Sequence, residues 1–145
     1  MNNLKKTLLV VEDEPMMRRL LLHIFSEKYN VVLKENGLEA IEWLKTGTSP
    51  SVIIADLNMP EIDGYEFMAE VRKYDYYNNV PLIVLSGEQG SDDRVKCLKR
   101  GADDFMTKPF NPEELEIRIE KLASLLGDKA GVSRMDGVKV MYKEA

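Results

Sequence analysis

The chain has 145 residues, which is enough for one domain with a real core and leaves no room for a second sizeable domain. Its net charge of -5 argues against nucleic-acid binding by this segment, because such binding depends on clustered Lys and Arg. The single cysteine cannot form an internal disulfide, and the sequence shows neither a signal peptide nor a long apolar span. We therefore expect a soluble, cytoplasmic protein that does not bind a membrane.

Five short apolar runs alternate with segments whose apolar residues recur at helical spacing. Such runs, bounded by turn residues, are typical of buried strands in a parallel sheet. Their strict alternation with helices predicts a doubly wound α/β fold. The predicted strands are 8–11, 31–33, 52–55, 82–85 and 104–107, and the predicted helices lie around 17–25, 40–44, 67–71, 91–98 and 115–126.

Helix signals agree with this assignment. Pro15 suits a first helical turn, and Ser91, followed by two aspartates, suits an N-terminal cap. Gly101 suits a C-terminal cap. Residues 127–145 have no amphipathic period, so we place the domain at 1–126 and expect 127–145 to be a flexible C-terminal tail or a linker.

Residues that can bind a metal ion or a phosphate follow four of the predicted strands. Glu12 and Asp13 follow the first strand, Asp56 follows the third, Ser86 follows the fourth, and Lys108 follows the last. Because ligands bind outside the carboxyl ends of parallel strands, these residues should converge on one edge of the sheet. Three crowded carboxylates favour a cation between them, and magnesium prefers oxygen ligands. The sequence therefore predicts a site for a divalent cation beside an anion.

Four segments resemble the receiver domain of two-component response regulators, in the form typical of the chemotaxis regulators. These segments are VEDEP at 11–15, DLNMPEIDG at 56–64, SG at 86–87 and GADDFMTKPF at 101–110, and the resemblance covers residues 5–126. It implies a flavodoxin-like five-stranded sheet in the order 2-1-3-4-5 with five helices. It also implies that Asp56 accepts a phosphoryl group from a phosphohistidine on a sensor histidine kinase or a phosphotransfer protein.

The resemblance implies roles for the acidic residues. Asp13, Asp56 and the backbone carbonyl of Asn58 would hold magnesium. Glu12 would act mostly through water, since Glu stands where many members of the family have Asp. Asn58 and Glu88 occupy positions that tune the access of water to the phosphoryl group, and polar residues at both suggest a short-lived phosphorylated state.

Three further residues would respond to the phosphoryl group. The Lys108 ammonium would stabilise its charge, and the family leads us to expect a cis bond from Lys108 to Pro109. The Ser86 hydroxyl would bond a phosphoryl oxygen, and Phe105 would turn inward when that hydroxyl moves. A phenylalanine that only fills the core is an equally good interpretation of Phe105.

Two enzyme-like or carrier alternatives share parts of this pattern. A phosphohydrolase of the haloacid dehalogenase type also uses a strand-end Asp, but it expects a second Asp two positions later, where this chain has Asn58. A flavin carrier would need a hydroxyl-rich phosphate loop after the first strand, and this sequence has none. Both alternatives are therefore disfavoured, and we expect a protein that catalyses only its own phosphorylation and dephosphorylation.

The sequence leaves two possibilities for the output of such a receiver. The fourth helix, last strand and last helix form the usual output face of the family. A stand-alone receiver and the amino-terminal part of a DNA-binding transcriptional regulator both fit. Charged residues that partly match the dimer face of winged-helix regulators are Arg94, Asp104, Glu114 and Arg118.

Overall fold

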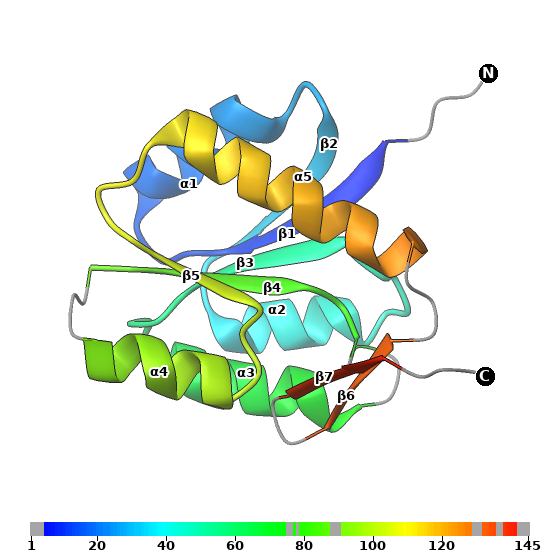
Figure 1. Ribbon diagram of the computed structural model, residues 1–145. Coiled ribbons are helices and arrows are strands. Elements are labelled where there is room, and N and C mark those ends of the chain that lie inside the picture. Colours follow the sequence, from blue (N-terminus) through cyan, green and yellow to red (C-terminus); the bar gives the residue numbers. More distant parts are fainter. Residues whose placement is uncertain are drawn as a thin grey trace.

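The computed structural model describes residues 5–74, 77, 79–87, 91–128, 132–135 and 138–141. Its main body is a parallel sheet of five strands with helices on both faces (Figure 1). The strand order β2-β1-β3-β4-β5 confirms the predicted topology. The strands are β1 (Lys6–Val11), β2 (Tyr29–Lys34), β3 (Val52–Asp56), β4 (Leu82–Ser86) and β5 (Asp104–Thr107).

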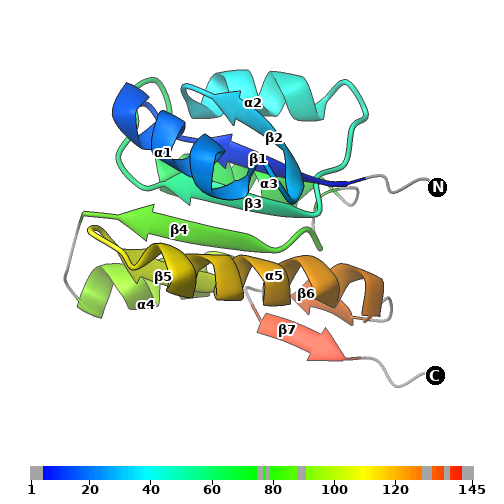
Figure 2. The same cartoon turned by 90° about the horizontal axis from the view of Figure 1, so that it is seen from above.

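Five helices connect and cover these strands, as predicted. Helices α1 and α5 pack on one face of the sheet, and α2, α3 and α4 pack on the other (Figure 1). Seen from above, the arrowheads of β1, β3 and β4 point the same way, so their carboxyl ends share one edge (Figure 2). The helices are α1 (Pro15–Phe25), α2 (Gly37–Leu44), α3 (Gly64–Lys73), α4 (Ser91–Lys99) and α5 (Pro112–Asp128).

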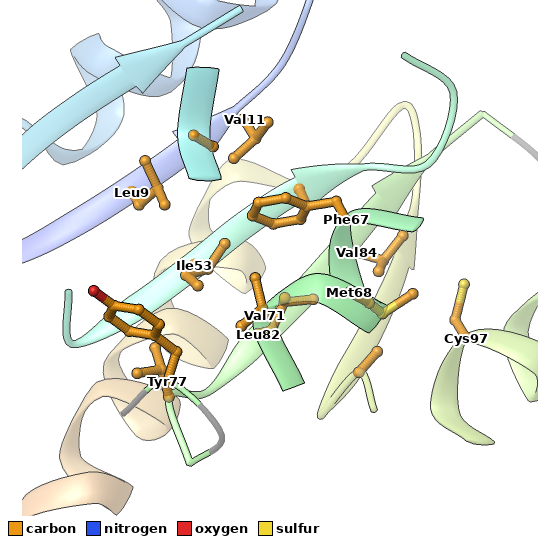
Figure 3. Close-up of a cluster of buried hydrophobic side chains, with 14 of the residues drawn as sticks. Leu9, Val11, Ile53, Phe67, Met68, Val71, Tyr77, Leu82, Val84 and Cys97 are labelled. Carbon is orange, nitrogen blue, oxygen red and sulfur yellow. The ribbon is translucent and has the colours of Figure 1, made fainter. Parts of the chain in front are cut away.

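The sheet is buried on both faces, which explains why its strands are continuous apolar runs and not alternating ones. Every residue of β3 and of β4 is buried. Ile53 and Leu82 pack with Phe67 of α3 on one face, where Figure 3 shows them together. Ile54 packs with Leu21 of α1 on the other face. Two hydrophobic clusters thus hold the central strands rigidly in register.

The helix ends follow local chemistry. Pro15 lies in the first turn of α1 and Gly101 follows α4 with φ of 118°, as predicted. Ser91, predicted as an N-terminal cap, is the first residue of α4. Helix α3 begins with a capping box, in which Asp63 accepts from the Glu66 amide at 2.9 Å and Glu66 accepts from the Asp63 amide at 3.1 Å. These caps fix where each helix leaves the edge of the sheet.

Arg72 at the end of α3 connects several segments at the opposite edge of the sheet. Its Nη2 donates to the Gly101 carbonyl at 2.8 Å, and its Nη1 donates to the Val80 carbonyl at 2.7 Å. Nη2 also pairs with Asp103 at 3.3 Å, whose carboxylate accepts from the Leu82 amide at 2.9 Å. Because the Arg72 and Asp103 side chains are 11% and 5% exposed, this pair is largely shielded from solvent. It joins α3, the end of α4 and the start of β4.

The end of the chain differs from the predicted pattern. Helix α5 continues through Asp128, and β6 (Val132–Met135) pairs antiparallel with β7 (Val138–Met141). Neither strand was predicted, because runs of four residues are too short to show a clear period. The domain boundary at 126 and the flexibility of 127–145 remain predictions. Among the residues described here, no helix is both long and apolar enough to cross a membrane.

Candidate functional site

Three carboxylates meet at the carboxyl edge of the sheet. Glu12 and Asp13 lie in the short connection between β1 and α1, and Asp56 is the last residue of β3. One oxygen from each of these side chains lies within 4.8 Å of the other two. Their positions after neighbouring strands account for this convergence. Glu12 and Asp56 are buried, while Asp13 is exposed and opens the cluster to solvent.

Glu12 is the most buried of the three acids, with an exposed fraction of 2%. Its Oε1 accepts from Lys108 Nζ at 3.0 Å, and its Oε2 accepts from the Glu14 amide at 3.2 Å. Its main chain is held as well, because its amide donates to the Lys34 carbonyl at 3.0 Å and its carbonyl accepts from Arg18 Nη1 at 2.8 Å. Glu12 is therefore bonded through both its side chain and its backbone.

Asp56 is 6% exposed and lies between an amide and a cation. Its Oδ1 accepts from the Asn58 amide at 3.4 Å, and its Oδ2 lies 3.6 Å from Lys108 Nζ. The chain turns sharply after this strand, with Glu61 at φ of 71° and the Gly64 amide donating to the Leu57 carbonyl at 2.8 Å. The turn leaves Asn58 exposed beside the acids.

The electrostatics of the cluster favour a bound cation. Burial, followed by the negative charge of Asp56, raises the pKa of Glu12. Burial also raises the pKa of Asp56, with a further increase from Asp13, while Lys108 acts in the opposite direction. Since the fold makes these carboxylates harder to ionise, a divalent cation between them would relieve the unfavourable charge. Oxygen ligands with one open, solvated side suit magnesium.

Lys108 and Ser86 border the acids on the β4 and β5 side. The Lys108 side chain is 20% exposed, and its amide donates to the Ser86 carbonyl at 2.8 Å, so the ends of the two strands are tied together. Ser86 is completely buried. The Lys108–Pro109 bond is cis, as the family resemblance implied. An ammonium group and a serine thus lie next to the carboxylates.

Phe105 is part of the core on the face that α4 covers, with an exposed fraction of 8%. Beside it lies a hollow of about 330 Å³ between α4, β5 and α5. Arg118 on its wall pairs with Asp104 at 2.7 Å and with Glu114 at 2.7 Å. Arg94 lines the same hollow, so the four residues predicted for a dimer face lie around one surface feature. Their role in a dimer remains a prediction.

One predicted site residue has no described position. Glu88 lies outside the described residues, so its predicted role as a tuning residue remains a prediction. The single histidine, His23, is exposed on α1, and the single cysteine, Cys97, is fully buried on α4; neither was predicted as a site residue. Arg18 was missed by the sequence prediction, although a signal existed: long helical side chains point back toward the preceding turn, which here is the Glu12–Glu14 connection.

Comparison with known proteins identifies the family. The family model described as "Response regulator receiver domain" matches residues 8–120. The chain therefore belongs to the response regulator receiver domain family, a family of signalling domains. Chemotaxis protein CheY1 of Helicobacter pylori is 37% identical over 122 residues, which are 83% of this chain and 96% of that protein.

Other relatives are longer than this chain. The probable transcriptional regulator ycf27 of Porphyridium aerugineum is 39% identical over 121 residues, which are 81% of this chain and 48% of that protein. A hybrid signal transduction histidine kinase of Dictyostelium discoideum is 35% identical over 121 residues, which are 83% of this chain and 8% of that protein. This chain thus spans half or less of the length of several curated relatives.

Solved structures confirm the fold. The receiver domain of a signal transduction histidine kinase from Syntrophus aciditrophicus is 36% identical, with a TM-score of 0.76 over 82% of this chain and 90% of that chain. The receiver domain of a sensor histidine kinase from Pseudomonas aeruginosa is 27% identical, with a TM-score of 0.76 over 83% of this chain and 98% of that chain. The latter structure is described with a magnesium ion coordinated in its active-site cleft.

Proposed function

We propose that this chain is the phosphoacceptor receiver of a two-component response regulator. Asp56 accepts a phosphoryl group from the phosphohistidine of a sensor histidine kinase or a phosphotransfer protein in the cytoplasm. The observation that carries this proposal is that Asp56 lies at the carboxyl edge of the sheet with two further carboxylates and Lys108, whose Nζ lies 3.6 Å from its Oδ2. A buried carboxylate surrounded in this way has both the nucleophile and the counter-charges for phosphoryl transfer.

In this reaction an Asp56 carboxylate oxygen forms a bond to phosphorus. The bond between phosphorus and the imidazole nitrogen of the donor breaks, and its electron pair stays on that nitrogen. The product is an acyl phosphate on Asp56, which water later hydrolyses. The chain thus catalyses only its own phosphorylation and dephosphorylation, with Asn58 and Glu88 tuning the approach of water.

Asp13, Asp56 and the Asn58 carbonyl would hold magnesium, with Glu12 acting mostly through water. The bound ion supplies positive charge that stabilises the phosphoryl oxygens during transfer. Glu12 also keeps Lys108 at the site, since its Oε1 accepts from Lys108 Nζ at 3.0 Å. From that position the Lys108 ammonium is close enough to Asp56 to meet the developing charge.

After transfer, the new phosphate biases the face formed by α4, β5 and α5. The Ser86 hydroxyl bonds a phosphoryl oxygen, and Phe105, which already packs in the core, adjusts its packing inward as that hydroxyl moves. Homodimerisation through this face suits a regulator like ycf27, whose length leaves half for a further domain such as a DNA-binding one. A stand-alone receiver like CheY1 is the other form that the comparisons support.

Asp56→Asn tests the assignment directly. We expect this variant to lose labelling by a small acyl phosphate donor in the presence of magnesium, while the wild type is labelled at one residue. Intact-mass spectrometry and peptide mapping give both the stoichiometry and the position. Full labelling of the variant at another residue would refute the proposal.

A further inference from the structure

We propose that Arg18 is a positioning residue for the magnesium site: its guanidinium holds the Glu12 carbonyl and so fixes the direction in which Asp13 presents its carboxylate. The inference rests on the proposed function, because it takes the three acids to be a magnesium site. Arg18 lies on the first turns of α1, outside the acidic cluster itself. It would act on the site through the backbone and not by touching the ion.

The contact of Arg18 with the connection between β1 and α1 is short and partly shielded. Its Nη1 donates to the Glu12 carbonyl at 2.8 Å, and its side chain is 17% exposed. Its second partner is weaker, since Nη2 lies 3.8 Å from Glu35 Oε2 and the Glu35 side chain is 64% exposed. An exposed ion pair at this distance contributes little. The carbonyl contact is therefore the main polar interaction of this guanidinium.

A planar peptide links that carbonyl to Asp13. The carbonyl oxygen of Glu12 and the amide and Cα of Asp13 belong to one rigid unit. A donor fixed on the oxygen consequently fixes the orientation of the unit and the point from which the Asp13 side chain departs. Asp13 itself is exposed and lies outside the helix and the strand, so it depends on such contacts for its position.

Other bonds hold Glu12 on the far side of its Cα, outside this peptide unit. The Glu12 amide is bound to Lys34 in β2, and its carboxylate is bound to Lys108 and to the Glu14 amide. Arg18 is what restrains the carbonyl between them. Metal sites commonly need such outer partners to orient their ligands, and losing one weakens metal binding by about 10- to 100-fold.

The positioning role and a simple charge effect predict opposite results. Arg18 carries a positive charge near a site that would bind a cation, so by charge alone its removal should strengthen magnesium binding. If Arg18 positions Asp13, its removal should weaken magnesium binding instead. The sign of the change therefore separates the two interpretations.

Four variants of the full chain test the proposal. Arg18→Met keeps an unbranched side chain and removes the donors, Arg18→Lys keeps the charge and one donor group, and Arg19→Met removes the same charge from an exposed neighbour on α1. Glu35→Gln removes the ion pair alone. The readout is the magnesium dissociation constant from isothermal titration calorimetry, with circular dichroism in a chelator to verify folding.

We expect Arg18→Met to raise the magnesium dissociation constant by about tenfold. Arg18→Lys should recover part of that loss, and Arg19→Met and Glu35→Gln should change the constant by less than about twofold. Equal or tighter binding by Arg18→Met than by Arg19→Met would overturn the inference. If Arg18→Met does not fold, wild-type affinity in Arg18→Lys overturns it, and weakened affinity supports it. Failure of the wild type to bind magnesium would instead overturn the proposed magnesium site.

Discussion

At the scale of single residues, ionisation of the buried carboxylates at the site is unfavourable when no cation is bound. Glu12 and Asp56 are buried beside each other, and burial raises the pKa of both. A carboxyl with a raised pKa in the folded state binds protons more tightly there than in the unfolded chain. The free energy of unfolding therefore falls as the pH rises from the ordinary carboxyl range through these raised values, and it stays lowered at neutral pH.

Magnesium should reverse this loss at neutral pH. At a hundredfold excess over its dissociation constant, it should stabilise the fold by about 2.7 kcal/mol, which thermal melts in magnesium and in chelator would measure. The gain should decline with acidification, starting above the ordinary carboxyl range because the pKa values of Glu12 and Asp56 are raised. Asp13→Ala should lose the gain. If millimolar magnesium left the melting temperature of the wild type unchanged, the proposed metal site would be contradicted.

The sequence could predict which residues meet, but not all of their bonds. Strand-end positions brought Glu12, Asp13 and Asp56 to one edge, because parallel strands share that edge. The ion pair of Glu12 with Lys108 joins residues 96 positions apart, and its 3.0 Å length depends on side-chain rotamers that no periodicity contains. The bond of Arg18 to the Glu12 carbonyl likewise depends on a side-chain rotamer, and its partner is a backbone group that no charge pattern reveals.

At the scale of elements, the starts of α2 and α3 offer a matched pair. Each helix begins with glycine directly after its cap, Gly37 in α2 and Gly64 in α3. A Cβ on Gly64 would lie 2.7 Å from the Asp56 carbonyl oxygen and 2.8 Å from Leu57 Cα. A Cβ on Gly37 would lie 2.6 Å from Ile62 Cγ1, which belongs to a partly buried side chain. The first clash is with backbone, while the second is with atoms that can rotate away.

We therefore expect Gly64→Ala to destabilise the fold by about 1–3 kcal/mol, the range for overpacking against a fixed neighbour. Gly37→Ala should lower stability by less than about 1 kcal/mol, because Ile62 can change its rotamer. Urea unfolding of both variants measures the difference. Equal losses in the two variants would show that the backbone after Asp56 yields as readily as the Ile62 side chain.

The strands show where sequence patterns predict the bounds of an element well and where they do not. The apolar run at 31–33 predicted an edge strand, and the structure extends it to Tyr29–Lys34, because pairing with β1 includes polar Asn30 and Lys34. The predicted bounds of buried strands such as β3 agree closely with the structure, since burial on both faces requires apolar residues along the whole strand. Edge strands carry no such requirement, so backbone pairing sets their ends.

At the scale of the whole molecule, the proposed function requires a change at Asp56 to reach α4 and β5. A phosphoryl group adds roughly -1.5 to -2 charges, enough to attract Ser86 and Lys108 and to bias a nearby element with two packings. Ser86 is fully buried at the end of β4, whose Val84 is paired with Phe105 in β5. The neighbouring strand ends thus give a short connection from the site to the hollow beside α4.

Ser86→Ala should therefore separate phosphorylation from its response. With magnesium and beryllofluoride, a phosphoryl mimic, the wild type should show amide NMR shifts at Val95, Leu98 and Phe105. The variant should still bind the mimic at Asp56 but show smaller shifts at these three positions, and Asp56→Asn should show none. Equally large shifts in Ser86→Ala would mean that the hydroxyl does not couple the site to this face.

The Arg72 network holds the carboxyl end of α4 differently from the rest of the helix. Its carboxyl end runs into Gly101, whose carbonyl accepts two bonds from Arg72, at 3.1 and 2.8 Å. Contacts further along α4 are side-chain ones, such as Tyr65 Oη to Asp93 at 3.3 Å and the Lys96 ammonium 4.4 Å from the Tyr65 ring. Arg72 thus holds the backbone at the carboxyl end of α4, while these contacts nearer its amino end involve side chains. If the proposed phosphorylation displaces α4, we therefore expect its carboxyl end to stay in place and the larger movement to occur at its amino end.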